Sequence, residues 1–90
     1  MEIKYSPVFG RRKIEYEFRE DIIIATVDGE TDTFDFSMFP DGKLEDITTT
    51  LSINPIGNVE RVDGVLRVEI LSFINEEATD EERFPDWQVV

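Results

Sequence analysis

The chain has 90 residues, 40% of them hydrophobic, and a formal net charge of −12 at pH 7. This length predicts one domain spanning residues 1–90, and this apolar content excludes a disordered acidic tail. The sequence has no cysteine and no histidine, which excludes disulfides and thiolate metal sites and removes the commonest general base and zinc ligand. We therefore expect a protein that is not an enzyme and has no catalytic residue, metal site or cofactor.

The negative charge also limits the expected partners. Nucleic-acid backbones and anionic membranes would repel such a chain, so we expect neither as a direct partner. The first ten residues have no apolar signal-peptide core, and no apolar run is long enough to span a bilayer. We expect a soluble cytoplasmic protein whose acidic surface keeps a β-rich fold in solution.

The chain begins with a predicted half-buried strand and a basic loop. Residues 1–6 alternate apolar and polar side chains, and Pro7 is expected to end this strand at a sheet edge because it cannot donate to a ladder. Residues 10–13, GRRK, form a loop with the only basic cluster. Such a cluster either binds an anionic ligand or offsets the negative charge of an acidic surface, and we favour the second interpretation.

The stretch 21–37, DIIIATVDGETDTFDFS, carries the strongest pattern in the chain. Two runs of β-forming residues flank Asp28-Gly29, the strongest short-range hairpin signal. The first run, 22–27, has no charged residue on either face. Because a strand on a solvated sheet alternates apolar with polar residues, this run predicts a central strand that is covered on both sides.

The preceding run, 14–19, completes a predicted three-stranded antiparallel meander. Two-residue turns at Glu20-Asp21 and Asp28-Gly29 bring every apolar alternation to one face, which fixes the register. The predicted pairs are Phe18 with Ile23, Tyr16 with Ala25, Ile14 with Val27, Ile23 with Phe34, and Asp21 with Phe36. The second face then carries Ile22, Ile24, Thr26, Thr31 and Thr33 at its centre. Something must cover or bind that face.

The second half of the chain predicts further strands and a second hairpin. A turn at 38–42 precedes an alternating run over 46–53, which predicts a strand, and residues 54–58 predict a reversal. A hairpin is then expected around Asp63-Gly64. Its predicted pairs are Val59 with Val68 and, on the outer face, Glu60 with Arg67.

Residues 75–90 form an acidic C-terminal segment that is expected to pack on the domain or to extend from it. A T-x-x-E capping box at 79–82, followed by Pro85, predicts one short helical turn. Phe84 and Trp87 either fold back over the uncovered face of the meander, which we favour, or form a docking element for a partner.

Together these patterns predict an all-β, antiparallel fold. We expect about seven short strands, built from hairpins into a small sandwich or partly open barrel, with one short C-terminal helical turn. For an apolar partner surface, we expect Ile22, Ile24, Phe84 and Trp87 to contribute the contacts.

Acidic residues are the only frequent titratable groups. Between Asp28 and Asp46 there are seven acids and one base, a local net charge of −6. Such a density is compatible with Ca²⁺, but the D-x-D-x-D-G type of loop is absent, so we favour a solvated acidic face. A glycosidase-like carboxylate pair would need one acid in an apolar pocket, and no pattern marks one.

Several turn motifs, taken together, resemble a family of small uncharacterised bacteriophage and prophage proteins. They are VDGE at 27–30, DFS at 35–37, PDG at 40–42 and VERVDGVL at 59–66. In that family a "DG…DFS.xPDG" hairpin precedes a "VERxDGxL" hairpin and a proline-bearing acidic tail, and the resemblance covers about 21–87. It implies a phage origin, often near tail genes, with no assigned activity and no catalytic residue.

We therefore expect a non-enzymatic phage or prophage accessory protein that acts by protein–protein contact in virion assembly or structure, in the tail region. Its partner would be a phage structural or assembly protein, or a second copy of the chain, in the cytoplasm of the bacterial host or in the virion. The alternative is an acidic decoy that mimics DNA and inhibits a host nucleic-acid-binding protein. Its charge row would be Glu15 with Glu17, or Asp32 with Asp35.

Overall fold

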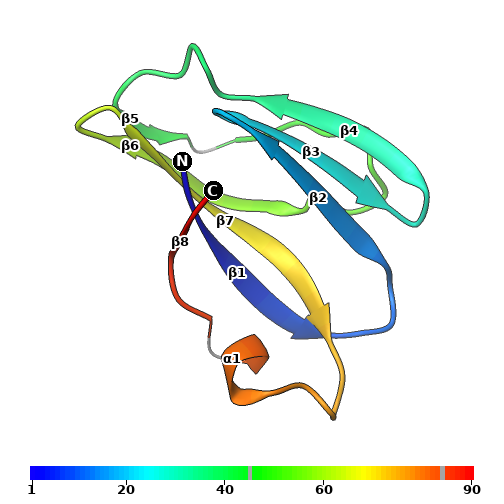
Figure 1. Cartoon of the computed structure of the whole chain (residues 1–90). Helices are drawn as coiled ribbons and strands as arrows, with labels where there is room; N and C mark the ends of the chain where they lie inside the picture. Colours follow the sequence, from blue (N-terminus) through cyan, green and yellow to red (C-terminus); the bar gives the residue numbers. More distant parts are fainter. Residues whose placement is uncertain (45, 84) are drawn as a thin grey trace.

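The computed structural model describes residues 1–44, 46–83 and 85–90, and its strands form two β-sheets that face each other (Figure 1). The elements are β1 (Glu2–Phe9), β2 (Ile14–Arg19), β3 (Ile22–Val27), β4 (Glu30–Asp35), β5 (Gly42–Leu44), β6 (Ile56–Val62), β7 (Val65–Ile74), α1 (Asp80–Arg83) and β8 (Gln88–Val89). One sheet has the order β5-β6-β7-β1-β8, and the other has the order β2-β3-β4. The predicted all-β class with one helical turn is confirmed, and the sheets are not closed into a barrel.

The three-stranded sheet is the predicted meander, and its register is confirmed. Phe18 lies opposite Ile23, and Ile23 lies opposite Phe34. Beyond the ladder, the Phe36 N–H donates to the Asp21 carbonyl at 3.0 Å, as the predicted pairing requires. The register is specified so strongly because a slip of one residue would move every core side chain of the meander to the solvent face.

The strand β3 is central, as predicted, but among the described residues a second layer covers only one of its faces. Its burial alternates: Ile23, Ala25 and Val27 are buried, whereas Ile22, Ile24 and Thr26 are half-buried. The prediction of two covered faces is therefore wrong. The absence of charged residues from this run is compatible with a covered second face. It does not require another layer of the protein to lie there.

The five-stranded sheet is not wholly antiparallel, in contrast to the prediction. β1 pairs with β7 in parallel along its whole length, from Glu2 opposite Arg67 to Phe9 opposite Ile74. β1 also continues through Pro7 instead of ending there. Its other side pairs with β8 only at its first two residues. Proline is tolerated at such a strand edge because the donor it lacks has no ladder partner there.

Residues 46–53 do not form the predicted strand. Leu51 still lies in the core. The hydrogen bonds of this segment, however, go to side chains and not to the main chain of a neighbouring strand. Asp32 accepts from the Thr49 hydroxyl and the Thr50 N–H, and the Asn54 carboxamide bonds the chain on both sides. Such local bonds compete with sheet pairing. The second half of the predicted reversal at 54–58 is also wrong, because residues 56–58 lie in β6, where the register with β7 shifts.

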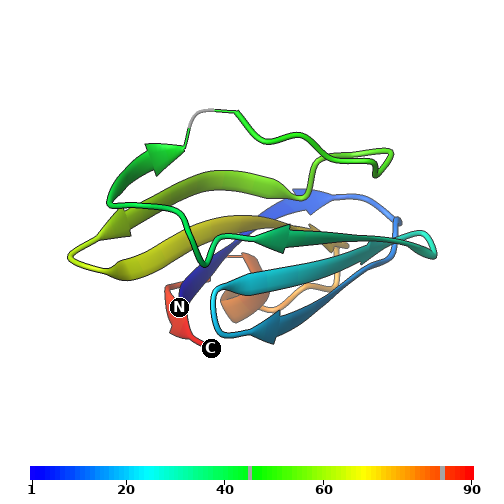
Figure 2. The ribbon, with the colours of Figure 1, turned by 90° about the horizontal axis from the view of Figure 1, so that it is seen from above.

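The hydrophobic core lies between the two sheets and draws on both. The buried apolar residues are Ile3, Ile23, Ala25, Val27, Phe34, Phe36, Leu51, Ile56, Val59, Leu66, Val68 and Ile70. Hydrophobic burial of such side chains stabilises a fold by about 1.5–3 kcal/mol each before the entropy of ordering is counted. Both views show the chain termini close together, and the Val90 N–H donates to the Met1 carbonyl at 3.0 Å (Figure 2).

Candidate functional site

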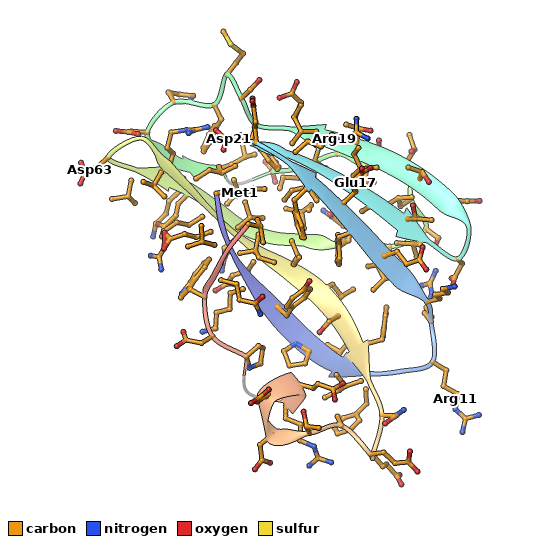
Figure 3. All side chains as sticks on the ribbon, in the orientation of Figure 1. Met1, Arg11, Glu17, Arg19, Asp21 and Asp63 are labelled. Atoms are coloured by element: carbon orange, nitrogen blue, oxygen red, sulfur yellow. The ribbon has the colours of Figure 1, made fainter. Side chains whose placement is uncertain are left out.

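The outward-facing side chains of β2, β3 and β4 form a regular grid, which we call the outer meander face. From the register, its three rows are Arg19-Ile22-Asp35, Glu17-Ile24-Thr33 and Glu15-Thr26-Thr31. The two isoleucines lie at the centre of the grid, with polar residues on both sides. Glu17 and Arg19 form an ion pair at 2.9 Å at one margin, and both are labelled in Figure 3.

Ile22 and Ile24 are not covered by another layer of the described chain. Both are half-buried, and neither belongs to the core or to the apolar residues packed against it. Their shielding comes from neighbours in the same sheet, such as Arg19 and Thr33, which flank them in the register. Two neighbouring branched apolar side chains thus remain accessible on the central strand of an otherwise polar surface.

The described part of the C-terminal segment, residues 75–83 and 85–90, does not cover this face, so the favoured prediction for Trp87 is wrong. β8 pairs with β1 at the edge of the five-stranded sheet, and the Trp87 ring lies over the Arg67 guanidinium, 4.1 Å from its carbon. Arg67 alternates with buried Leu66 and Val68, so it points away from the core. Trp87 therefore lies on the opposite side of the sandwich from Ile22 and Ile24. The prediction for Phe84 lies outside the described residues.

The surface beneath Trp87 is a groove of about 450 Å³ on the outer face of the five-stranded sheet. Four charged residues cross its strands in alternating sign, in the order Lys43, Glu60, Arg67, Glu2. Arg67 lies 3.4 Å from Glu2 and 3.5 Å from Glu60. The charged residues that line the groove itself are Lys43, Glu60, Arg67 and Glu69, two of each sign, so they give no net attraction for a charged ligand.

Sequence patterns missed Arg61, which connects the two sheets. Its guanidinium bonds Asp21 at 3.0 Å, between β2 and β3, and the carbonyls of Phe36, Phe39 and Gly64 at 2.7–2.9 Å. Only 11% of its side chain is exposed. A signal was present in the sequence, because the alternation of β6 assigns Arg61 to the core-facing side. Charged residues are rarely placed there without a partner.

Two aspartates of β4 are engaged by neighbouring hydrogen bonds. The Thr49 hydroxyl and then the Thr50 N–H hold the pKa of Asp32 below its ordinary value, and Ser37 does the same for the pKa of Asp35. Asp32 lies opposite buried Ala25, whereas Asp35 lies on the outer meander face. The predicted Asp32 and Asp35 charge row is therefore wrong, because the two residues point to opposite faces.

The predicted basic loop lies between β1 and β2. Arg12 pairs with Asp28 at 2.9 Å and Lys13 with Glu15 at 3.2 Å. Two of the three cations are thus compensated by neighbouring acids, which favours the offsetting interpretation over an anion site. Within the described residues, no group of three or more acidic side chains could hold a metal ion.

Comparison of the chain with protein-family models, curated proteins and solved structures finds no significant match. Within residues 1–44, 46–83 and 85–90, no helix has the length and apolar character needed to cross a membrane.

Proposed function

We propose that this chain is a non-enzymatic protein-binding component of a bacteriophage or prophage, and that it binds its partner through the outer meander face. The observation that carries the proposal is the accessible pair of Ile22 and Ile24 at the centre of that face. A partner that covered the pair would remove apolar surface from water, the main favourable term in association. The polar margin would supply orientation and specificity.

The phage setting of this proposal rests on the sequence resemblance of the paired hairpin motifs. The partner would be a structural or assembly protein of the virion, in the tail region. A sheet face with apolar residues on its central strand and a charged margin suits contact with a large surface better than it suits a small substrate, because small ligands are usually bound in concave sites.

The contacts give less support to the DNA-mimic alternative. Glu15 and Glu17, the remaining candidate charge row, are paired with Lys13 and Arg19. A DNA mimic needs a long row of negative charges at regular spacing, and this row is only two residues long, with Lys13 and Arg19 at its two ends. We therefore retain the apolar docking mode as the proposed function.

Deletion of the gene from an inducible prophage, followed by electron microscopy of the particles, tests the role in tails. We expect shortened, absent or malformed tails. Normal, infectious tails in the deletion strain would contradict the proposal. Wild-type protein supplied in trans should restore normal tails, which controls for effects on neighbouring genes.

A double variant tests the face itself. Ile22→Thr with Ile24→Thr removes apolar surface from the outer meander face while keeping β-branched side chains, and we expect it to fail in complementation. Val62→Thr with Val65→Thr is the matched control, because these exposed valines lie opposite each other at the β6–β7 hairpin. Thermal unfolding of both variants shows whether each remains folded. Equal complementation by the two folded variants would exclude the outer meander face as the contact surface.

A further inference from the structure

The two sheets have unequal widths, and β2 is an edge strand. In β2 the Lys13 carbonyl, just before the strand, accepts from the Asp28 N–H at 3.0 Å. Hydrogen-bonded and non-hydrogen-bonded pairs alternate along an antiparallel ladder. The odd-numbered residues of β2 therefore bond β3, and the even-numbered residues, Ile14, Tyr16 and Phe18, turn their N–H and C=O groups away from it. The described chain pairs no strand with this side of β2.

The side chains of the same three residues point toward the five-stranded sheet but are only half-buried. Tyr16 stacks on Phe18 with ring centroids 6.1 Å apart and meets Tyr5 of β1 at 6.3 Å. These rings form an aromatic margin along the open side of the sandwich. A strand added beside β2 would cover them and would satisfy the free main-chain groups at the same time.

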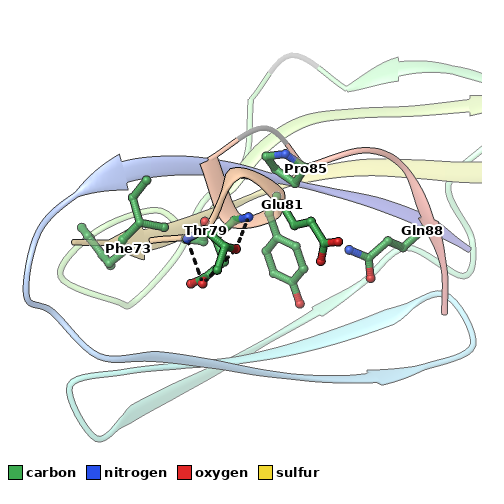
Figure 4. Close-up of a pocket in the computed structure, with 9 residues that line it drawn as sticks. Phe73, Thr79, Glu81, Pro85 and Gln88 are labelled. Carbon is green, nitrogen blue, oxygen red and sulfur yellow. Dashed lines mark hydrogen bonds between the residues drawn. The ribbon is translucent and has the colours of Figure 1, made fainter. Parts of the chain in front are cut away.

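Space for the side chains of such a strand lies next to Tyr5. An open cleft of about 570 Å³ begins at Tyr5 and lies between the C-terminal end of β7 and the C-terminal segment. Phe73 and Pro85 contribute apolar surface, and Glu81 and Gln88 contribute polar groups (Figure 4). No lysine or arginine is among the described lining residues.

We propose that an extended segment of a partner protein pairs with the free edge of β2. Its alternate side chains would be apolar toward Tyr5 and the cleft, and basic on the other face, opposite Glu15 and Glu17. The ion pairs of Glu15 with Lys13 and of Glu17 with Arg19 join exposed side chains and contribute little, so both glutamates remain available to a basic strand directly opposite them. Opposite charges on directly paired strands stabilise a sheet, and the net charge of −12 attracts a basic segment. This mode of strand addition rests on the proposed protein-binding function and extends it, because main-chain bonds supply affinity while alternate side chains supply specificity.

Synthetic peptides with alternating valine and lysine test the edge directly, with a valine–glutamate peptide and a scrambled valine–lysine peptide as controls. Amide hydrogen exchange of the full chain is followed by NMR. At a free peptide concentration about four times its Kd, about one fifth of the protein molecules have no peptide bound. Amide exchange at Ile14, Tyr16 and Phe18 should therefore slow about fivefold, because these amides exchange only in the unbound molecules. Glu15 and Glu17 already bond β3, so their exchange should change much less, which makes them internal controls.

Two further measurements separate strand addition from other binding. N-methylation of the peptide residues whose N–H groups face β2 should abolish the protection, whereas methylation of the alternate residues should leave it intact. The variant Glu15→Lys with Glu17→Lys, which changes exposed side chains only, should reverse the preference from the basic peptide to the acidic one.

Several outcomes would overturn the inference: no protection at the even-numbered residues with any peptide, equal protection at odd and even residues, or no effect of the charge reversal. Light scattering that shows a dimer with these amides already protected would also overturn it, because a second copy would then occupy the edge. Defective tails in the deletion strain without peptide protection would refute strand addition alone. Peptide protection with normal tails in that strain would refute the phage role alone.

Discussion

Arg61 shows how one side chain can position a whole sheet. It extends from β6 to the carboxylate of Asp21 in the β2–β3 turn and to main-chain carbonyls in the segment that follows β4. A lysine would match the charge but not this set of bonds, because only a guanidinium has several donors in a rigid plane. The residue thereby fixes the end of the meander against the five-stranded sheet.

Replacing this side chain should therefore be costly. We expect Arg61→Ala to lower the free energy of unfolding by about 3 kcal/mol, because it leaves a partly buried carboxylate and several carbonyls without their donor. Arg61→Lys should recover only part of the loss. Urea unfolding followed by the fluorescence of the single tryptophan measures both.

The matched control is Arg19→Ala, which removes an exposed arginine from the pair with Glu17. It should change the free energy of unfolding by less than about 1 kcal/mol, as is usual for surface ion pairs. Equal costs at Arg19 and Arg61 would show that Arg61 does not hold the sheets together.

Tyr16 connects the sheets at another point. Its hydroxyl donates to the Leu71 carbonyl of β7, and burial, aided by the nearby Tyr5, raises the pKa of Tyr16 well above its ordinary value of 10.0. Because the pKa of Tyr16 is higher in the folded state than in the unfolded state, the folded state is favoured as long as the hydroxyl is protonated. This contribution to the free energy of unfolding is fully present below pH 10 and is lost as the pH rises above that value. Alkaline solution should therefore weaken the fold.

We expect Tyr16→Phe to cost about 1 kcal/mol at pH 7, because the Leu71 carbonyl loses its donor. Above pH 10 the variant should lose less stability than the wild type, since it has no hydroxyl to ionise at this position. Urea unfolding curves between pH 7 and 11 test whether the difference in the free energy of unfolding between the two proteins becomes smaller as the pH rises. Parallel pH profiles for the two proteins would show that Tyr16 ionisation does not affect folding.

At the scale of elements, the hairpin turns differ in how well their residues suit their backbone. Asp63-Gly64 has positive φ at both positions, +50° and +83°, and places glycine where it is favoured. Glu20 has a φ of +53° although it is neither glycine nor asparagine. Such a residue is strained in this region.

We therefore expect opposite effects from two turn substitutions. Glu20→Asn should raise the free energy of unfolding by about 0.5 kcal/mol, because asparagine tolerates positive φ better than glutamate does. Gly64→Ala should lower it by roughly 1–2 kcal/mol through backbone strain, although no atom lies within 4 Å of the added methyl position. Thermal unfolding of both variants is the measurement, and a stabilising Gly64→Ala would contradict the backbone argument.

The elements predicted well from the sequence are those whose signal is local. Asp28-Gly29 and Asp63-Gly64 fix hairpins between neighbouring strands, and the T-x-x-E box is seen as reciprocal bonds between Thr79 and Glu82. The parallel pairing of β1 with β7 was not predictable in this way, because its partners are more than 60 residues apart and no turn connects them. Residues 46–53 show the opposite failure: an alternating pattern was present, but side-chain bonds to Asp32 replaced the ladder.

The candidate site was predictable to a similar extent. The predicted hairpin register alone placed Ile22 and Ile24 on a second face of the meander, since this register depends only on the turns between neighbouring strands. The position of Trp87 depends on where the C-terminal segment returns, and it is set by pairing with β1 and by the contact with Arg67. Neither contact can be predicted from the residues that neighbour Trp87 in the sequence.

For the whole molecule, charge is the dominant feature. A net charge of −12 on 90 residues makes the folded state repel itself. Raising NaCl from about 0.01 M to about 1 M shortens the Debye length from about 30 Å to about 3 Å. We expect this change to raise the melting temperature by about 4–8 °C, the shift that corresponds to about 1 kcal/mol in a domain of this size. A melting temperature that falls with added NaCl would show that ion pairs outweigh the repulsion.

The parallel pairing of β1 with β7 has a consequence for how the protein is made. As the chain leaves the ribosome, residues 14–36 can form their meander early, because all of its strands are adjacent in sequence. β1 is synthesised before the meander, yet its long partner strand, Val65–Ile74, follows the meander by almost 30 residues. Until β7 has been synthesised, β1 therefore has no long neighbouring strand, and its apolar face is exposed to chaperones and to other nascent chains.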